Sequence, residues 1–124
     1  MEQLLRDPSD ATSISAVNLA ETLDVLVRVQ GWPADQIEQR IRWLTIGGLA
    51  VVPVDELIAL EAGRLHAQHY HRSRRPLSLA DCVALATAHA LGMPLATSDP
   101  HLAQTAMEIG VALVALPDAR GRRP

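Results

Sequence analysis

The stretch that decides the fold is residues 95–116, LATSDPHLAQTAMEIGVALVAL. Residues 95–98 are expected to form a strand, and the Asp99-Pro100 pair is typical of a helix start. Gly110 predicts the end of that helix, and the run at 111–116 predicts a second strand. A strand, a helix and a second strand in succession indicate two parallel neighbours, so the segment predicts a parallel sheet covered by helices.

The rest of the chain repeats this alternation. Further strands are expected at 13–17 and 49–54, so the whole chain predicts four strands and five helices. The other four helices are expected to follow Asn18, Pro33, Asp55 and Ser78. We therefore expect one α/β domain over residues 1–124, a three-layer parallel sheet with helices on both faces, ending in a flexible tail at 117–124.

Composition excludes several classes of protein. The chain has 124 residues, a formal net charge of −3 and eleven basic residues, all of which are arginine. Without lysine it has no P-loop phosphate site. The single Cys82 excludes a disulfide framework and suits a reducing, cytoplasmic setting. No apolar run reaches the ~20 residues that a membrane span needs.

Three carboxylates are candidates for chemistry: Glu21, Asp81 and Asp99. Each is expected in the first turn of a helix that follows a strand or loop, and ligands bind at that edge of α/β sheets. Carboxylates that converge there would repel one another unless a divalent cation such as Mg²⁺ lay between them. A purely structural interpretation is equally open, because all three fit helix caps or capping boxes.

Three segments carry a resemblance to a known family. SAVNLAE at 15–21, LSLAD at 77–81 and LATSD at 95–99 resemble the second, third and fourth acidic motifs of VapC-type toxins, which are PIN-domain proteins. The resemblance extends over nearly the whole chain. It implies a Mg²⁺- or Mn²⁺-dependent endoribonuclease, the toxin of a toxin–antitoxin pair, which hydrolyses RNA with metal-activated water.

The resemblance also implies a site and partners. Glu21, Asp81 and Asp99 would be the metal ligands and catalytic residues, with Thr97 and Ser98 in support or, equally, as helix-capping hydroxyls. The expected partners are an antitoxin, RNA and a second copy of the chain in a homodimer. The alternative is an impaired or inactive PIN-like module that binds an antitoxin or RNA without cutting.

The chain departs from the family at its beginning. Family members open with a central strand that ends in an aspartate, and residues 1–12 resemble only the end of the helix that follows it and the next loop. The expected sheet therefore lacks its central strand, and the expected site has three carboxylates instead of four.

Two further clusters have a structural and a functional interpretation. Arg72, Arg74 and Arg75 suit either a solvated helix end or a contact with the RNA backbone. On the helical hairpin, core packing is one interpretation, and the resemblance suggests an antitoxin groove that includes Ile41, Trp43 and Leu44.

Overall fold

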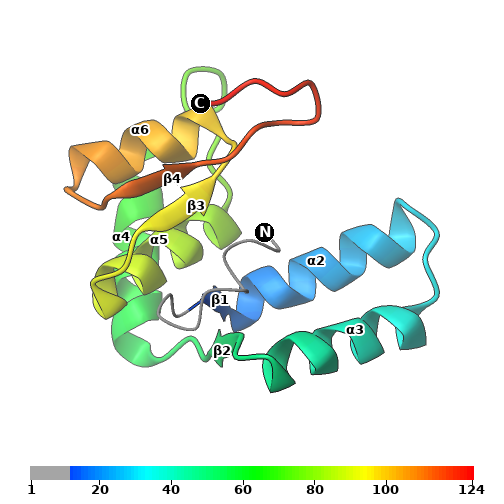
Figure 1. The fold of residues 1–124 in the computed structure, drawn as a ribbon. Coiled ribbons are helices and arrows are strands. Elements are labelled where there is room, and N and C mark those ends of the chain that lie inside the picture. The colour runs from blue at the N-terminus through cyan, green and yellow to red at the C-terminus, as the bar shows by residue number, and fades with distance from the viewer. Residues whose placement is uncertain (1–11) are drawn as a thin grey trace. The chain divides into compact units, whose positions relative to one another are not determined.

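The computed structural model describes residues 12–124 and contains, in this range, the predicted four strands and five helices. Their order along the chain is shown in Figure 1. The elements are β1 (Ser13–Ser15), α2 (Ala16–Arg28), α3 (Ala34–Ile46), β2 (Ala50–Val52), α4 (Glu56–His69), α5 (Leu79–Leu91), β3 (Leu95–Thr97), α6 (Pro100–Glu108) and β4 (Leu113–Ala115). The prediction of a helix and loop remnant at 1–12 lies almost wholly outside the described residues.

The chain divides into two compact units, Met1–Pro53 and Val54–Pro124. Within residues 12–124 the strands pair as two parallel two-stranded sheets: β1 with β2 in the first unit, and β3 with β4 in the second. Parallel pairing is as predicted. Because the described strands form two sheets and not one, the three-layer arrangement around a missing central strand stays a prediction.

In the first unit, α2 begins earlier than the sequence predicts. The strand expected at 13–17 ends at Ser15, whose hydroxyl accepts a hydrogen bond from the Asn18 backbone N–H at 3.0 Å and caps the helix. A serine hydroxyl is a strong helix cap, so the helix starts at Ala16 instead of Asn18. The expected capping box between Asn18 and Glu21 is therefore wrong.

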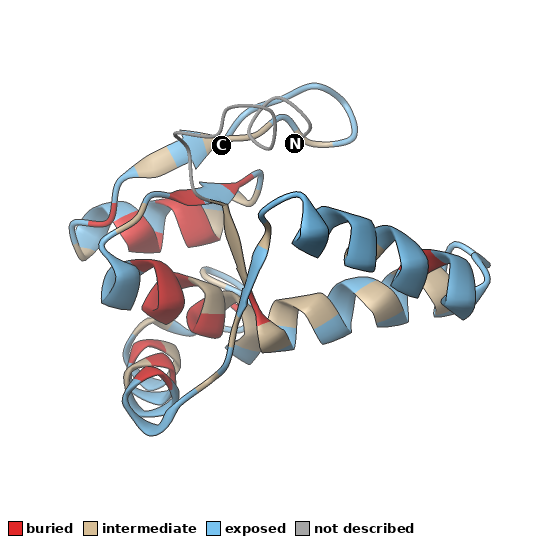
Figure 2. Cartoon of the chain, turned by 60° about the horizontal axis from the view of Figure 1, so that its bottom comes forward, coloured by how far each residue is buried: buried red, intermediate tan, exposed pale blue. Residues whose placement is uncertain are grey.

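The helical hairpin of α2 and α3 buries little. Between residues 12 and 53 only Ser15 and Ile37 are buried, and the hairpin is accordingly almost without buried positions in Figure 2. Large apolar side chains remain in solvent instead, among them Val29, Trp43 and Ile46. Trp43 and Ile46 are three residues apart on α3 and line one depression, and an exposed apolar helix face of this kind is typical of a surface that another molecule covers.

The second unit carries a continuous core. Helix α5 lies at its centre, packed against α4 and α6 and against β3, and its Cys82, Leu85 and Ala86 are completely inaccessible to solvent. Figure 2 shows the buried positions gathered on these helices. Gly92 ends α5 in the left-handed conformation, with φ of 63°, which other residues adopt only with strain. The turn at Gly92 leads the chain directly back into β3.

The last strand starts later than the sequence predicts. The strand expected at 111–116 begins only at Leu113, because the Val111 N–H bonds back to Ala106 near the end of α6. In the tail at 117–124 the side chain of Asp118 bonds to the backbone of Arg120 and Arg122, and the flexibility expected of this tail stays a prediction.

Candidate functional site

Asp81 lies in the first turn of α5 and forms the predicted capping box with Ser78. Its Oδ2 accepts the Ser78 backbone N–H at 2.9 Å, and the Ser78 hydroxyl accepts the Asp81 N–H at 3.0 Å. These bonds fix the orientation of the carboxylate. Within residues 12–124 the other oxygen, Oδ1, has no hydrogen-bond partner, so Asp81 can both cap the helix and offer one oxygen to a ligand.

Asp99 caps α6 in a similar way. Its Oδ1 accepts the backbone N–H groups of His101 at 2.8 Å and Leu102 at 3.4 Å. Across the described chain its Oδ2 makes no hydrogen bond. The cap again holds one oxygen and leaves the other available, while the amino end of the helix favours the ionised form of the carboxyl group.

Asp81 and Asp99 face the same end of the second unit. Helix α5 and strand β3 pack against each other and are joined by the short turn at Gly92, so they run in opposite directions (Figure 1). The start of α5, with Asp81, and the residue after β3, with Asp99, therefore lie at the same end. This end is also the carboxyl edge of the parallel β3–β4 pair, where ligands bind in α/β proteins.

Glu21 occupies a different position from the one predicted. Because α2 begins at Ala16, Glu21 lies in the second turn and not the first, and it is exposed. It therefore has no capping role. Glu21 belongs to the first unit and the two aspartates to the second, and within either unit no three His, Cys, Asp or Glu residues of the described chain are grouped to hold a metal. A site shared by all three stays a prediction.

The two residues expected to support the site, Thr97 and Ser98, differ in the exposure and the hydrogen bonds of their hydroxyl groups. Thr97 is buried, and its Oγ1 accepts the Asp99 backbone N–H at 3.0 Å, so it helps to position the start of α6. Ser98 is exposed and makes no hydrogen bond within residues 12–124. Of the two, Ser98 has the hydroxyl that is open to a ligand.

The three arginines between α4 and α5 differ in their exposure and in their partners. Arg75 is bound to Glu108 by two hydrogen bonds of 2.7 and 2.9 Å, and only 17% of its side chain is exposed. Arg72 and Arg74 are exposed, and neither guanidinium has a partner in the part of the chain that the structure describes. The RNA contact expected of the cluster is therefore open to Arg72 and Arg74, whereas Arg75 has a structural role.

A short turn presents these two arginines. The backbones of His71 and Arg75 bond to each other in both directions, at 2.8 and 3.0 Å. Inside the turn the His71 Nδ1 accepts the backbone N–H groups of Ser73 and Arg74 at 3.2 and 3.0 Å. The turn is thus closed at both its base and its tip.

The residues expected to meet an antitoxin are accessible to different degrees. Trp43 is 64% exposed and Leu44 39%, whereas Ile41 is partly buried. Trp43 and Ile46 also line a shallow depression along α3 with Asp35, Glu38, Gln39 and Arg42. Trp43 is therefore not part of the first unit's own core, and an exposed tryptophan of this kind is a frequent anchor of protein interfaces.

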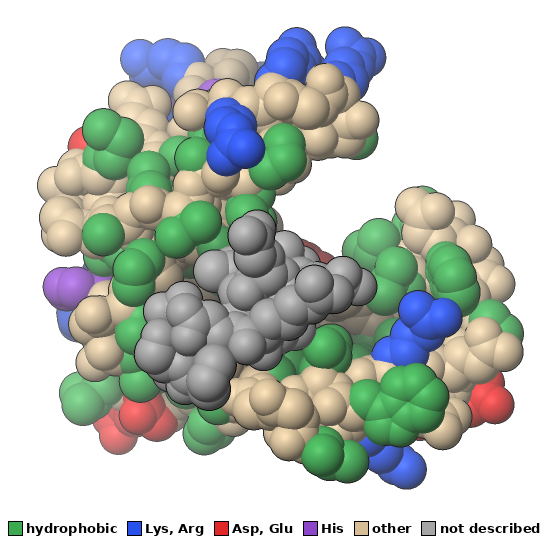
Figure 3. All heavy atoms as spheres, in the orientation of Figure 1, with side chains coloured by type: hydrophobic (Ala, Val, Ile, Leu, Met, Phe, Trp, Pro, Cys, Tyr) green, Lys and Arg blue, Asp and Glu red, His purple; other side chains and the backbone are tan. Residues whose placement is uncertain are grey.

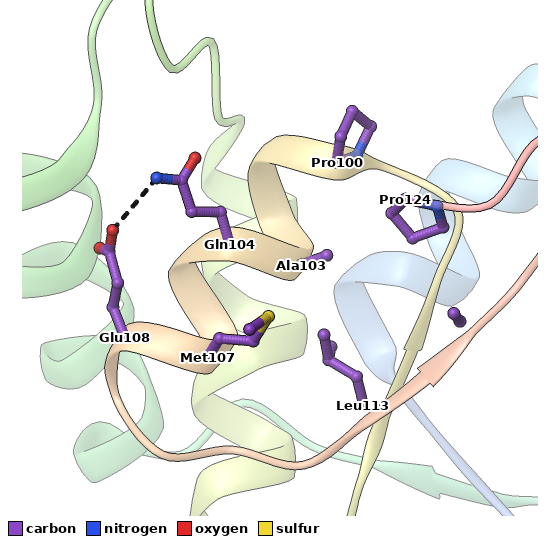
Figure 4. A pocket seen from close by; sticks show the side chains of 8 residues that line it. Pro100, Ala103, Gln104, Met107, Glu108, Leu113 and Pro124 are labelled. Atoms are coloured by element: carbon purple, nitrogen blue, oxygen red, sulfur yellow. Dashed lines mark hydrogen bonds between the residues drawn. The ribbon is translucent and has the colours of Figure 1, made fainter.

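A second hollow, of about 430 Å³, lies over α6 and β4. Figure 4 shows side chains from α6 and β4 around it, together with Pro124 at the end of the chain. Its lining is largely apolar, which does not suit a metal or phosphate. Sequence reasoning missed this hollow, because it depends on the return of the C-terminal segment to α6.

The family model of the PIN domain matches residues 1–108. The chain therefore belongs to the PIN domain family, whose members are generally nucleases and typically metal-dependent. No curated protein matches the chain. None of the helices between residues 12 and 124 is long and apolar enough to cross a bilayer.

Proposed function

We propose that this chain is a VapC-type toxin, a Mg²⁺- or Mn²⁺-dependent endoribonuclease that a cognate antitoxin inhibits in the cytoplasm. The observation that carries the proposal is the pair Asp81 and Asp99. Each is fixed by a helix cap through one oxygen and has the other oxygen free, and both lie at one end of the second unit. A carboxylate that is held in place through one oxygen and has its other oxygen free is a suitable ligand for a hard cation.

The carboxylate oxygens of Asp81 and Asp99 are the kind of ligand that such a metal prefers. Mg²⁺ and Mn²⁺ prefer oxygen ligands, and one or two carboxylates with waters are sufficient for Mg²⁺. Asp81 and Asp99 would hold the ion, with Glu21 as the third carboxylate. When bound, the ion would supply a hydrolytic nucleophile at neutral pH and neutralise negative charge on the phosphate.

The chain's own groups would position the substrate. The Ser98 hydroxyl, next to Asp99 and free of other bonds, would donate to a phosphate oxygen. Arg72 and Arg74 would contact the RNA backbone, since the guanidinium fork matches phosphate geometry. The capping bonds of Asp81 and Asp99 limit the reorientation of both carboxylates, which reduces the entropic cost of assembling the site.

The proposed protein partners use other surfaces. The antitoxin would cover the exposed apolar side of the hairpin, with Trp43 and Leu44 as anchors and Ile41 beneath them. A homodimer is the proposed state of the toxin.

The test is cleavage of single-stranded and structured RNA by the purified chain, with Mg²⁺, with Mn²⁺ and with EDTA. Asp81→Asn and Asp99→Asn are the informative variants, because an asparagine side-chain oxygen can still accept the capping N–H bonds while the negative charge is lost. We expect cleavage only with metal, and a loss of at least about a hundredfold in either variant, which is the range of losses when a key catalytic group is removed.

Folding is monitored in the same samples by circular dichroism and thermal melting. Asp35→Asn, an exposed aspartate in the first turn of α3, is the matched control and should cleave normally. Metal-dependent cleavage that survives both site variants would refute the proposed ligands. Binding of RNA without cleavage under any condition would favour the non-catalytic module.

A further inference from the structure

The chain ends in a small hydrogen-bonded hook, residues 117–124, built around Asp118. The Asp118 Oδ1 accepts the backbone N–H groups of Arg120 at 2.8 Å and Arg122 at 2.9 Å, and its Oδ2 accepts the Arg122 Nε–H at 3.2 Å. Two backbone bonds close the turn, from Asp118 N–H to Arg122 at 2.6 Å and from Gly121 N–H to Asp118 at 2.9 Å. One carboxylate thus organises the whole hook.

The hook lies beside the candidate site. Thr97 is paired with Ala115 in the β3–β4 register, and the Leu116 N–H donates to the Thr97 carbonyl at 2.9 Å. The chain therefore leaves β4 at the same sheet edge at which Asp99 follows β3. Pro124, at the end of the hook, lies with Pro100 on the wall of the hollow over α6 (Figure 4).

Two of the three arginines in the hook, Arg120 and Arg123, have no acidic partner among the described residues. Arg122 is paired with Asp118, but Arg120 has no side-chain partner within residues 12–124. Arg123 donates one N–H to the Ala115 carbonyl at 2.9 Å, which places its guanidinium at the end of β4 and leaves its other donors free. Arg72 and Arg74, on the turn between α4 and α5, likewise have no acidic partner among the described residues, whereas Arg28 and Arg75 are paired with acids.

Basic side chains gather over the part of the second unit where the C-terminal segment lies (Figure 3, in the orientation of Figure 1). The chain as a whole is acidic, with a net charge of −3. Bulk attraction therefore does not account for binding to a polyanion, and local cations must supply it. Arginines on a fixed turn suit phosphate better than flexible cations, because less entropy is lost on binding.

We infer that the hook at 117–124 is a phosphate-binding element, in which Arg120 and Arg123 hold the backbone of a single-stranded nucleic acid beside Asp99. The inference rests on the proposed function, which it deepens by placing the substrate along the β4 side of the site. Asp118 is a positioning residue in this arrangement, since it contacts only the hook.

The decisive variant is Asp118→Ala, because two explanations predict opposite results. Removing an acidic residue raises the net charge and would strengthen binding to RNA if only bulk charge mattered. If the hook holds the phosphates, the same variant releases the arginines and weakens binding. Binding is measured with fluorescently labelled single-stranded RNA in EDTA, so that it does not depend on cleavage.

We expect Asp118→Ala and the double variant Arg120→Gln/Arg123→Gln each to weaken binding by roughly three- to tenfold. The double variant should also flatten the salt dependence, by ~0.7 in the slope of log K against log salt for each phosphate that the protein no longer neutralises. Arg42→Gln/Arg64→Gln is the control, because it removes the same charge from exposed positions on α3 and α4 and should have a smaller effect.

Cleavage with Mg²⁺ is measured separately on the same variants, where the hook variants should raise KM and leave kcat nearly unchanged. Unchanged or tighter binding by Asp118→Ala, or equal losses in the hook and control double variants, would overturn the inference even if cleavage is normal. Absence of cleavage together with hook-dependent binding would refute the nuclease and support the hook.

Discussion

Arg75 and Glu108 form a bidentate ion pair, in which Arg75 Nη1 donates to Glu108 Oε2 at 2.7 Å and Nη2 donates to Oε1 at 2.9 Å. The pair ties the turn after α4 to the end of α6. The Arg75 guanidinium also donates to the ring Nδ1 of His69 at 3.1 Å. Gln104 donates to Glu108 at 3.3 Å, the bond drawn in Figure 4. Bidentate geometry makes this pair stronger than an ordinary surface ion pair.

The pair predicts a pH-dependent stability. The hydrogen bonds from Arg75 hold the pKa of the Glu108 carboxyl below its usual range. A carboxyl with a lowered pKa stabilises the fold at pH values above its unfolded value of about 4.3, and this contribution disappears as the pH falls through the folded value. Glu108→Gln should therefore lower the melting temperature at pH 7 and lower it less at pH 2.

Thermal melts of both proteins at these two pH values measure the effect. Glu38→Gln, an exposed change on α3 with no ion pair in the described structure, is the control and should melt like the parent at both. An equal loss by Glu108→Gln at pH 2 and pH 7 would show that the ion pair is not the cause.

Much of the fold follows from local sequence. The order of elements and the caps at Ser78 and Asp99 depend on residues a few positions apart, and they are predicted correctly. The parallel pairing joins more distant residues, but the alternation of strands and helices predicts it correctly as well. The start of α2 is not, because Ser15 and Asn18 are both good caps and only the folded backbone decides between them.

Interactions between distant parts of the sequence were less predictable. The Arg75–Glu108 pair joins residues that are far apart along the chain, so Arg75 resembles Arg72 and Arg74 in the sequence but not in the structure. The C-terminal hook is polar and rich in arginine, and the bonds that Asp118 makes within it are not apparent from the sequence. The flexible tail expected there stays a prediction. The role of Glu21 in a shared site is still a prediction, because it depends on how the two units assemble.

The capping box of α5 predicts a stability effect that can be separated from the chemistry. Ser78→Ala removes the hydroxyl that accepts the Asp81 N–H but leaves the Asp81 carboxylate in place. Loss of such a cap costs about 1 kcal/mol of unfolding free energy. Urea unfolding should show this loss, and RNA cleavage should fall far less than in Asp81→Asn. Equal loss of cleavage in both variants would indicate that Asp81 acts only through the cap.

Cys82 is predicted to be chemically inert in the folded protein. Its thiol is completely inaccessible to solvent, and burial, with a smaller effect of the Asp81 charge, raises its pKa to about 11. Because the thiolate is the reactive form, the fraction available at pH 8 is lowered on the order of a hundredfold relative to a free cysteine. Ellman's reagent at pH 8 should label the native protein very slowly and the urea-unfolded protein at the normal rate. Rapid labelling of the native protein would contradict the buried position.

Trp43 provides a test of the proposed antitoxin surface. Its side chain is 64% exposed, so Trp43→Ala should change the unfolding free energy by no more than about 0.5 kcal/mol. If the antitoxin covers this side of α3, the same variant should still cleave RNA but escape inhibition by the antitoxin. Leu57→Ala on α4, which is also exposed, is the control. Inhibition of both variants at the same antitoxin concentration would place the antitoxin elsewhere.

Glu21 is the most exacting test of the site, because the structure leaves it no local role. It is exposed in the second turn of α2, does not cap the helix, and its side chain makes no hydrogen bond within residues 12–124. Glu21→Gln should therefore leave the unfolding free energy within about 0.5 kcal/mol of the parent value. If Glu21 joins Asp81 and Asp99 at one cation, the variant should need more Mg²⁺ and cleave RNA at least about tenfold more slowly.

The control for Glu21 lies on the same helix. Asp24→Asn removes a carboxylate one turn further along, where Asp24 is paired with Arg28 at 3.0 Å and has a structural partner of its own. Cleavage is measured against Mg²⁺ concentration for the parent and both variants. A rightward shift confined to Glu21→Gln would place Glu21 at the metal. Identical curves for all three proteins would remove Glu21 from the site. Of the three candidate carboxylates, only Asp81 and Asp99 would then remain.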